Sequence, residues 1–268
     1  MKKTFCAVVL ALALPAALLA YENSPSNYQM LPEAVWSAAT GGGTWVTELQ
    51  ITDHTGSSSV DAYYYYTTGA YRAVSLWTSP GYENSAKWSN ILATMQALDG
   101  GFTYYGTSGC LWLNTQGTGN LISAAARISN GNYGKTLPGL QWTDSNTANL
   151  NRNMRLMNIM FSSNYRTFGG FFNAISGGYS MTVRLWVIGT GWVYYGATDE
   201  TFAPWEYKTF NLFTRCGITS GTYTSNWLWV NPTASGSSGA NTKGLICYGS
   251  IANNTTNDTY AIIAVQWQ

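Results

Sequence analysis

Charged residues are scarce in this sequence. Only 9% of its 268 residues are charged, with 13 Lys and Arg against 12 Asp and Glu, which leaves a formal net charge of +1. About a quarter is usual for a globular protein. The sequence shows no basic cluster, and nucleic-acid binding depends on clustered Lys and Arg that displace counterions. We therefore expect no nucleic-acid partner.

Histidine is almost absent. The single histidine, His54, lies in the turn Asp53-His54-Thr55-Gly56 after an expected strand. A Ser-His-Asp triad would have to use it, and one histidine cannot build a histidine-rich zinc site. A surface-turn histidine is the favoured interpretation. The sequence thus predicts no catalytic residue, no metal site and no cofactor.

Cysteines are few, and three of the four, Cys110, Cys216 and Cys247, lie beyond residue 20. An odd number in an oxidising compartment leaves one thiol unpaired. Because Cys216 and Cys247 share the second half of the chain, they are the candidate disulfide pair. The alternative is that all three are small buried apolar side chains.

Long apolar runs are absent beyond residue 20. Lys2 and Lys3 precede an apolar run from Phe5 to Ala20, which is typical of a signal peptide over residues 1–20. We expect cleavage before Tyr21, followed by an N-terminal segment over residues 21–33. The run is shorter than the roughly 20 residues of a membrane-spanning helix. A secreted protein is expected, extracellular or at the cell surface, with the periplasm possible, and no transmembrane span.

Aromatic residues are abundant, at 15%, and Gly, Ser, Thr and Asn fill much of the rest. Aromatic side chains favour strands, and Gly and Asn favour turns. Strict alternation over Trp45–Asp53 predicts a half-buried antiparallel strand. Val60–Tyr66 and Tyr71–Trp77 predict a hairpin. Together these patterns predict an all-β fold.

The chain repeats itself. Asn226-Trp227-Leu228-Trp229-Val230-Asn231 echoes Leu111-Trp112-Leu113-Asn114 about half a chain earlier. We predict an internal duplication that gives two tandem antiparallel β-sandwiches, immunoglobulin-like or jelly-roll-like. Their expected bounds are residues 34–135 and 154–268, with a linker over 136–153. The stretch Met154–Phe161 is ambiguous, since its apolar residues would fit a helical face. The register of the repeat instead sets Met157–Ser162 opposite Ala34–Ala39 as an opening strand, and we favour the strand.

One short helix is expected in each copy. Apolar residues from Trp88 to Leu98 recur at helical spacing before Gly100, which is a plausible stop. The corresponding residues of the second copy precede Gly217. A core-facing role is favoured for both helices.

Two stretches resemble a known group. Thr44-Trp45-Val46-Thr47-Glu48-Leu49-Gln50-Ile51 and the Asn-rich turn Asn253–Asp258 are similar to phrases of uncharacterised, secreted bacterial tandem β-sandwich proteins. The resemblance spans most of the chain beyond the leader and implies a fold and a location. It implies no activity and no site residues.

Exposed aromatic rings are the remaining functional signal, since Trp and Tyr on a sheet face can stack on sugar rings. The candidate ligand-binding residues are Tyr63, Tyr64, Tyr65, Tyr66, Trp192, Tyr194 and Tyr195. The first expectation is a non-catalytic surface or matrix module that acts by self-association or adhesion. The alternatives are a carbohydrate-binding module and, more weakly, a glycoside hydrolase with paired carboxylates. Partners would be the protein itself or a surface glycan.

The last apolar stretch, Tyr260–Trp267, carries no charge, Pro or Gly. It is suited to pairing with a second copy through a β-edge. The alternative, which we favour, is that it is the last core strand of the second sandwich.

Overall fold

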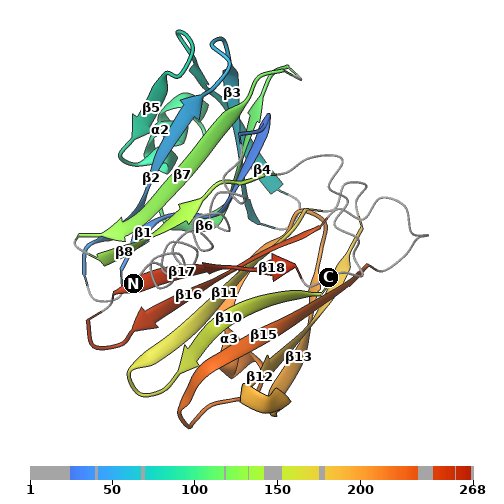
Figure 1. The fold of residues 1–268 in the computed structure, drawn as a ribbon. Helices are drawn as coiled ribbons and strands as arrows, with labels where there is room; N and C mark the ends of the chain where they lie inside the picture. The colour runs from blue at the N-terminus through green and yellow to red at the C-terminus, as the bar shows by residue number, and fades with distance from the viewer. Residues whose placement is uncertain are drawn as a thin grey trace, which may run out of the picture.

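The structure is a computed structural model, and it describes residues 25–39, 42–67, 70–117, 119–131, 133–141, 153–174, 179–234, 244–256 and 258–266. The expected signal peptide and residues 142–152 of the expected linker lie outside these ranges. The described chain is built mainly of antiparallel strands arranged as two sandwiches, one above the other in Figure 1. The prediction of an all-β sandwich fold is confirmed.

The first sandwich runs from β1 to β9. Its elements are β1 (Tyr28–Ala38), β2 (Thr44–Asp53), β3 (Ser59–Thr67), β4 (Ala70–Thr78), β5 (Ser85–Trp88), α2 (Ile91–Asp99), β6 (Thr107–Thr115), β7 (Ile122–Asn130), β8 (Tyr133–Pro138) and β9 (Leu140–Gln141). One layer has the order β4-β3-β6-β1-β9 and the other β5-β2-β7-β8. The layers are joined where the end of β1 pairs with the start of β2.

The second sandwich repeats this plan. Its elements are β10 (Met154–Phe161), β11 (Tyr165–Asn173), β12 (Met181–Ile188), η1 (Thr190–Trp192), β13 (Tyr194–Phe202), β14 (Tyr207–Asn211), α3 (Leu212–Arg215), β15 (Tyr223–Ala234), β16 (Leu245–Asn253), β17 (Thr259–Ile263) and β18 (Val265–Gln266). The layers have the orders β13-β12-β15-β10-β18 and β14-β11-β16-β17. Each strand pairs as the strand nine places earlier does, except that, within the described residues, β10 and β11 belong to separate sheets and do not repeat the pairing of β1 with β2.

Small details repeat with the topology. The buried hydroxyl of Thr47 bridges the backbone of Val35 between β2 and β1, and Thr167 bridges Met160 in the same way between β11 and β10. An asparagine side chain also caps the start of each helix, Asn90 before α2 and Asn211 before α3. Such caps satisfy backbone N–H groups that a helix leaves unpaired at its start.

Strand bounds differ from the predicted domain bounds. β1 begins at Tyr28, within the expected N-terminal segment, because apolar residues from Met30 on are buried in the sheet. β8 and β9 extend the first sandwich to Gln141, into the expected linker. The helix expected from Trp88 begins only at Ile91, as α2, and Trp88 is instead the last residue of strand β5. Residues 154–161 form a strand and not a helix, and this strand begins three residues before the expected start at Met157.

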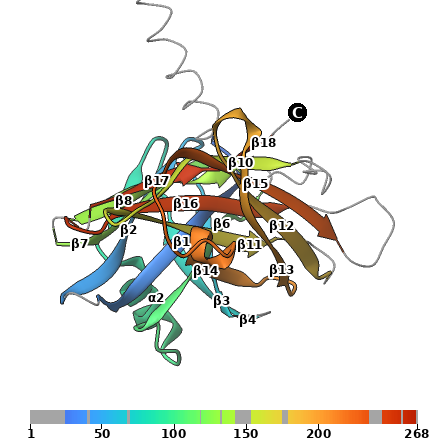
Figure 2. The ribbon, with the colours of Figure 1, turned by 90° about the horizontal axis from the view of Figure 1, so that it is seen from below.

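The C-terminal stretch is not one strand. β17 pairs with β16 in one layer, and β18 pairs with β10 in the other. β17 also lies alongside β8 of the first sandwich, as both ribbon views show (Figures 1 and 2). Pairing of an unbroken Tyr260–Trp267 strand with a second copy does not fit this division; Trp267 itself is outside the described residues.

Three clusters of buried apolar residues hold the molecule together. One fills each sandwich, and the third, which we call the junction, joins the two sandwiches. The junction takes Tyr65 and Cys110 from the first sandwich, and Phe172, Tyr207 and Tyr248 from the second. The sandwiches therefore pack on one another through an apolar interface.

The three described cysteines are buried free thiols. Cys216 and Cys247 lie in the same core cluster, but the predicted bridge between them is not formed in the structure. Burial raises the pKa of the Cys216 thiol to about 12 and also raises that of Cys247. Both side chains act as small apolar core residues.

Asp53 and Asn173 occupy matching positions at the ends of β2 and β11, but the Asp53 side chain accepts hydrogen bonds whereas the Asn173 side chain donates them. The Asp53 carboxylate accepts hydrogen bonds from Thr55 and from the backbone and hydroxyl of Ser58. Burial favours the neutral carboxyl, but the hydrogen bonds outweigh it and hold the pKa of Asp53 well below its usual value. The Asn173 amide instead donates to the carbonyls of Tyr179 and Ala203, at 3.1 and 2.9 Å.

Exchanging these two side chains should therefore give different pH dependences. At pH 7, Asn173→Asp should lower the free energy of unfolding by about 3 kcal/mol, because a carboxylate would face carbonyl oxygens in a buried site. The pKa of the new carboxyl would be raised, so the penalty should shrink already between pH 7 and pH 5 as it protonates.

The control is Asp53→Asn, with a penalty of about 2 kcal/mol from lost charged hydrogen bonds. Because the native pKa of Asp53 is depressed, that penalty should stay constant to pH 5 and shrink only below the unfolded value of about 4. Urea denaturation at several pH values measures both. Identical pH profiles for the two variants would contradict the assignment.

Candidate binding surface

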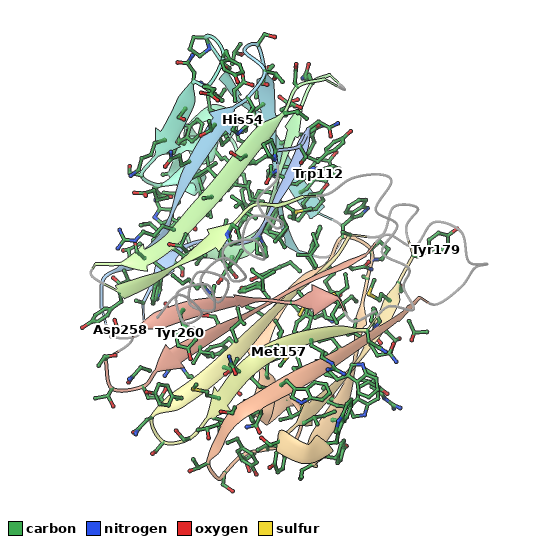
Figure 3. The ribbon with its side chains drawn as sticks, in the orientation of Figure 1. His54, Trp112, Met157, Tyr179, Asp258 and Tyr260 are labelled. Atoms are coloured by element: carbon green, nitrogen blue, oxygen red, sulfur yellow. The ribbon has the colours of Figure 1, made fainter. Side chains whose placement is uncertain are left out.

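The outer face of the β4-β3-β6-β1-β9 layer is covered by the second sandwich. The Tyr65 ring on β3 lies 5.1 Å from the ring of Phe172 and 5.4 Å, stacked, from Trp205. Trp205 also stacks over Trp112 of β6 at 6.2 Å. Tyr65 is only 4% exposed as a result. Trp112 lies close to the second sandwich in Figure 3.

The strand registers identify the equivalent face in the second sandwich. Trp112 is opposite Tyr63 on β3 and Met30 on β1, and Trp229 is opposite Trp186 on β12 and Arg155 on β10. Trp186 thus takes the place of Tyr63, and Arg155 the place of Met30. On the same grounds Trp227 takes the place of Cys110. No described segment of the chain covers this second face as Phe172 and Trp205 cover the first.

Four tryptophans form this surface, which we call the tryptophan face: Trp186, Trp192, Trp227 and Trp229. The rings of Trp186 and Trp229, from adjacent strands, lie 5.0 Å apart. Trp192, from the turn η1, meets Trp227 edge-on at 5.1 Å and an interplanar angle of 89°. The rings therefore form one continuous aromatic surface across β12 and β15.

Trp192 is the most open of these rings, at 61% exposed. Its backbone has φ of 64°, in the left-handed region that bulky residues rarely adopt. Such a conformation costs on the order of 1–3 kcal/mol and concentrates at functional sites. The turn holds the ring out from the sheet at this cost.

Two arginines lie among the rings. The Arg155 guanidinium is over Trp227 at 4.2 Å and over Trp192 at 5.2 Å, which are cation–π distances. Partial burial lowers the pKa of Arg155. Arg184 lies over Trp186 at 5.7 Å and donates two hydrogen bonds to Asp199, both 2.6 Å. The surface thus combines apolar ring faces with fixed hydrogen-bonding groups.

The structure divides the predicted site residues into two groups. Tyr64 is fully buried in the first core, where burial raises its pKa above the usual value, and Tyr65 is buried at the junction. Tyr63 and Tyr66 are partly buried, packed on the junction and on the first core respectively. Trp192, Tyr194 and Tyr195 are exposed, at 61%, 60% and 40%. The run Tyr63–Tyr66 is therefore not a free binding surface.

Five residues of the surface were missed by the sequence analysis: Arg155, Arg184, Trp186, Trp227 and Trp229. A signal for four of them was present. Arg184 and Trp186 are two residues apart between buried residues of β12, and Trp227 and Trp229 stand in the same relation on β15. A spacing of two puts both side chains on one face of a strand. Arg155 carried no comparable signal.

The covering patch of the second sandwich has a polar counterpart in the first. By register Phe172 corresponds to Thr52, Tyr207 to Ser85 and Ala174 to His54. Thr52 and Ser85 are bonded to each other through their hydroxyls at 2.8 Å, and this pair is exposed. The first sandwich of another molecule therefore has no apolar patch at this position with which to cover the tryptophan face. Stacking of further sandwiches through this position is disfavoured.

His54 and two of the described acidic residues, Asp199 and Glu200, each have a local polar partner. His54 Nε2 is 2.9 Å from the hydroxyl of Ser123. Asp199 and Glu200 point to opposite sides of β13, each paired with an arginine, Arg184 and Arg215. Among the described residues there is no group of His, Cys, Asp and Glu close enough to hold a metal ion. Nor, in the same residues, is any helix long and apolar enough to cross a membrane.

Comparison with known proteins adds little. No family model and no curated protein matches the chain. A solved structure titled as the T13 IBDV viral particle is similar over 91% of this chain and 68% of that one, at 9% identity and a TM-score of 0.23. A Bacteroides uniformis β-glucuronidase 2 is similar over 84% of this chain but 25% of its own, at 8% identity and a TM-score of 0.16. Scores this low carry no argument about function.

The two aromatic surfaces should contribute differently to stability. Trp205→Ala should lower the free energy of unfolding by about 3 kcal/mol, because it removes a ring packed between the sandwiches. Trp192→Ala should cost less than about 1 kcal/mol, since the ring is mostly exposed. Urea denaturation compares the two variants. Equal losses would contradict the assignment of Trp205 to packing between the sandwiches and of Trp192 to an open surface.

Proposed function

We propose that this protein is an exported, non-catalytic adhesion module whose tryptophan face binds a carbohydrate. The single observation that carries the proposal is the unequal use of one sheet face. The first sandwich buries its aromatic face at the junction, whereas the second presents four tryptophans with no described covering segment. Export is expected from the leader pattern of residues 1–20.

The surface has the properties that sugar recognition needs. Planar rings stack on the apolar C–H faces of sugars, and large aromatic side chains lose little conformational entropy on binding. Contiguous exposed apolar patches on soluble proteins commonly mark binding sites. Trp192 and Tyr194, at 61% and 60% exposed, supply open rings for stacking.

Polar groups beside the rings can select among sugars. The Arg184–Asp199 pair is anchored on adjacent strands, opposite each other in register. Its hydrogen bonds raise the pKa of Arg184 and lower that of Asp199, so both stay charged over the ordinary pH range. Charged groups held in this way donate to and accept from sugar hydroxyls in a fixed geometry. Because the ring surface and these groups stand on a sheet, the site is formed before the ligand arrives.

A glycan array followed by calorimetric titration of the best ligand tests this proposal. We expect selective binding, and a loss of about tenfold or more in affinity for Trp192→Ala, which corresponds to about 1.4 kcal/mol. Tyr82→Ala is the matched control: Tyr82 is a similarly open ring, 68% exposed, on the first sandwich. The Tyr82→Ala variant should bind the ligand with the affinity of the wild-type protein.

Three outcomes would contradict the proposal. They are no selective binding on the array, unchanged affinity in Trp192→Ala, and turnover of the bound sugar. Sedimentation velocity on the same samples detects self-association. If Trp192→Ala dissolves an oligomer but changes no glycan affinity, the tryptophan face is a self-association surface instead.

A further inference from the structure

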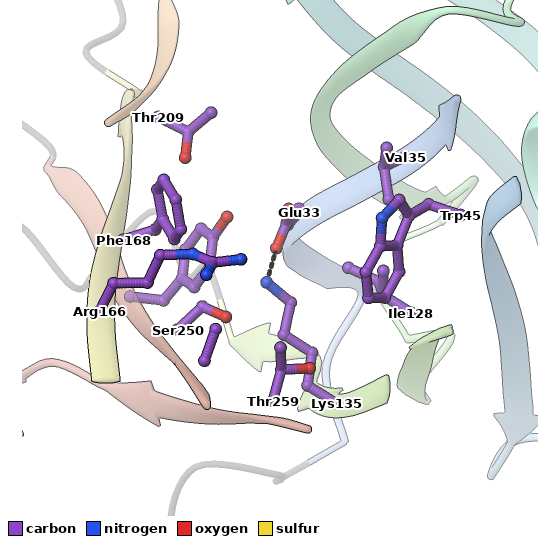
Figure 4. Close-up of a pocket in the computed structure, with 12 residues that line it drawn as sticks. Glu33, Val35, Trp45, Ile128, Lys135, Arg166, Phe168, Thr209, Ser250 and Thr259 are labelled. Atoms are coloured by element: carbon purple, nitrogen blue, oxygen red, sulfur yellow. Dashed lines mark ion pairs between the residues drawn. The ribbon is translucent and has the colours of Figure 1, made fainter. Parts of the chain in front are cut away.

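A cleft between the two sandwiches has the features of a second, separate site. Its volume is about 260 Å³, and it is lined from the first sandwich by Glu33, Trp45 and Lys135 and from the second by Arg166, Ser250 and Thr259. Figure 4 shows these side chains converging from both sides. Ligand sites commonly form at such interfaces between packed units.

The floor of the cleft carries a buried ion pair. The Glu33 carboxylate contacts the Lys135 ammonium, and the two side chains are only 13% and 9% exposed. Lys135 Nζ also lies 5.2 Å from the centre of the Tyr248 ring. Because these two charges compensate each other, the pair contributes no net charge to the cleft.

Arg166 supplies the excess positive charge. Its guanidinium donates to the neutral side-chain oxygen of Asn254 and lies 5.6 Å from the Phe168 ring. No carboxylate of the described residues forms an ion pair with it, whereas Arg72, Arg184 and Arg215 each have one. In Figure 4 it points toward the Glu33–Lys135 pair. A cation beside a polar cleft favours an anion, and a guanidinium binds a carboxylate through two parallel hydrogen bonds.

Thr259 adds a hydroxyl that needs a partner. Its Oγ1 atom is buried, and within the described part of the chain it has no hydrogen-bond partner. A buried polar group without a partner costs about 1–3 kcal/mol, so a ligand or water that bonds to it is favoured. The wall opposite the second-sandwich residues is the indole of Trp45.

We propose that this cleft binds a sugar acid, with its carboxylate on Arg166, a hydroxyl on Thr259 and its ring against Trp45. The cavity is smaller than the roughly 300–1,000 Å³ of sites for drug-sized ligands, which suits a single sugar residue. The residue can be a free sugar acid or the terminal unit of an acidic polysaccharide. This site is independent of the tryptophan face.

Such a ligand touches both sandwiches and should therefore hold them together. Anything that binds the folded state but not the unfolded state raises the apparent stability, and the gain grows with the logarithm of its concentration above Kd. Calorimetric titration and thermal denaturation of the whole mature protein with glucuronate should show saturable one-to-one binding and a rising Tm. Glucose, which lacks the carboxylate, should bind at least tenfold more weakly, and inorganic phosphate, which lacks the ring, should bind no better than glucose.

Arg166→Gln should weaken glucuronate binding tenfold or more and remove the preference over glucose. Arg127→Gln is the matched control, since Arg127 is exposed on β7 and does not line the cleft. Trp192→Ala should leave glucuronate binding at the cleft unchanged, which separates this proposal from the glycan site. A trigalacturonate that binds more tightly than galacturonate identifies a polysaccharide end as the source, and equal affinities identify the free acid.

The proposal is overturned by absence of glucuronate binding at millimolar concentration, by equal binding of glucuronate and phosphate, or by unchanged binding in Arg166→Gln. Thr259→Val provides a second variant that should weaken binding while leaving the charge of the cleft intact. Thermal denaturation of each variant without ligand establishes that it is folded.

Discussion

The two sandwiches are held against one another by a stack of aromatic rings. The centre of the Tyr65 ring lies 5.1 Å from that of Phe172 and 5.4 Å from that of Trp205. Burial of these large rings supplies the apolar area that fixes how the halves lie. Three consequences follow from that placement. It buries Tyr65 on the tyrosine-rich face of the first sandwich, it forms the cleft around Glu33 and Lys135, and it leaves the tryptophan face without a covering segment among the described residues.

One strand plan therefore carries different surfaces in the two halves of the chain. Strand pairings and helix caps repeat between the halves, but the side chains on corresponding surfaces diverge. Phe172 and Trp205 correspond to Thr52 and Glu83, and both Trp205 and Glu83 keep a positive φ, 59° and 53°. The turn has the same backbone conformation in both halves, but its side chains are apolar in the second half and polar in the first. The apolar version of this surface packs on the first sandwich, and the polar version, with the Thr52–Ser85 hydroxyl pair, is exposed.

The fold could be predicted from the sequence to a large extent, because alternation, turn residues and the repeated Leu-Trp phrase are local signals. The opening strand at residues 154–161 was recovered only through the repeat register. For the candidate site residues, the sequence predicted exposure correctly for some and wrongly for others. Trp192 lies in the turn η1 and Tyr194 begins β13 directly after it, and their exposure follows from this position. The burial of Tyr65 depends instead on Phe172 and Trp205, more than a hundred residues away. No local pattern carries that information.

Hydroxyl-radical footprinting of the intact protein, read by peptide mass spectrometry, tests the central claim most directly. Rates should be high for Trp192 and Tyr194, and low for Tyr65, which is 4% exposed. Trp205→Ala, which opens the stack, should raise the rate of Tyr65 and leave that of Trp192 unchanged. Rapid oxidation of Tyr65 in the wild-type protein, or slow oxidation of Trp192, would contradict an account in which one aromatic face joins the sandwiches and the other is free.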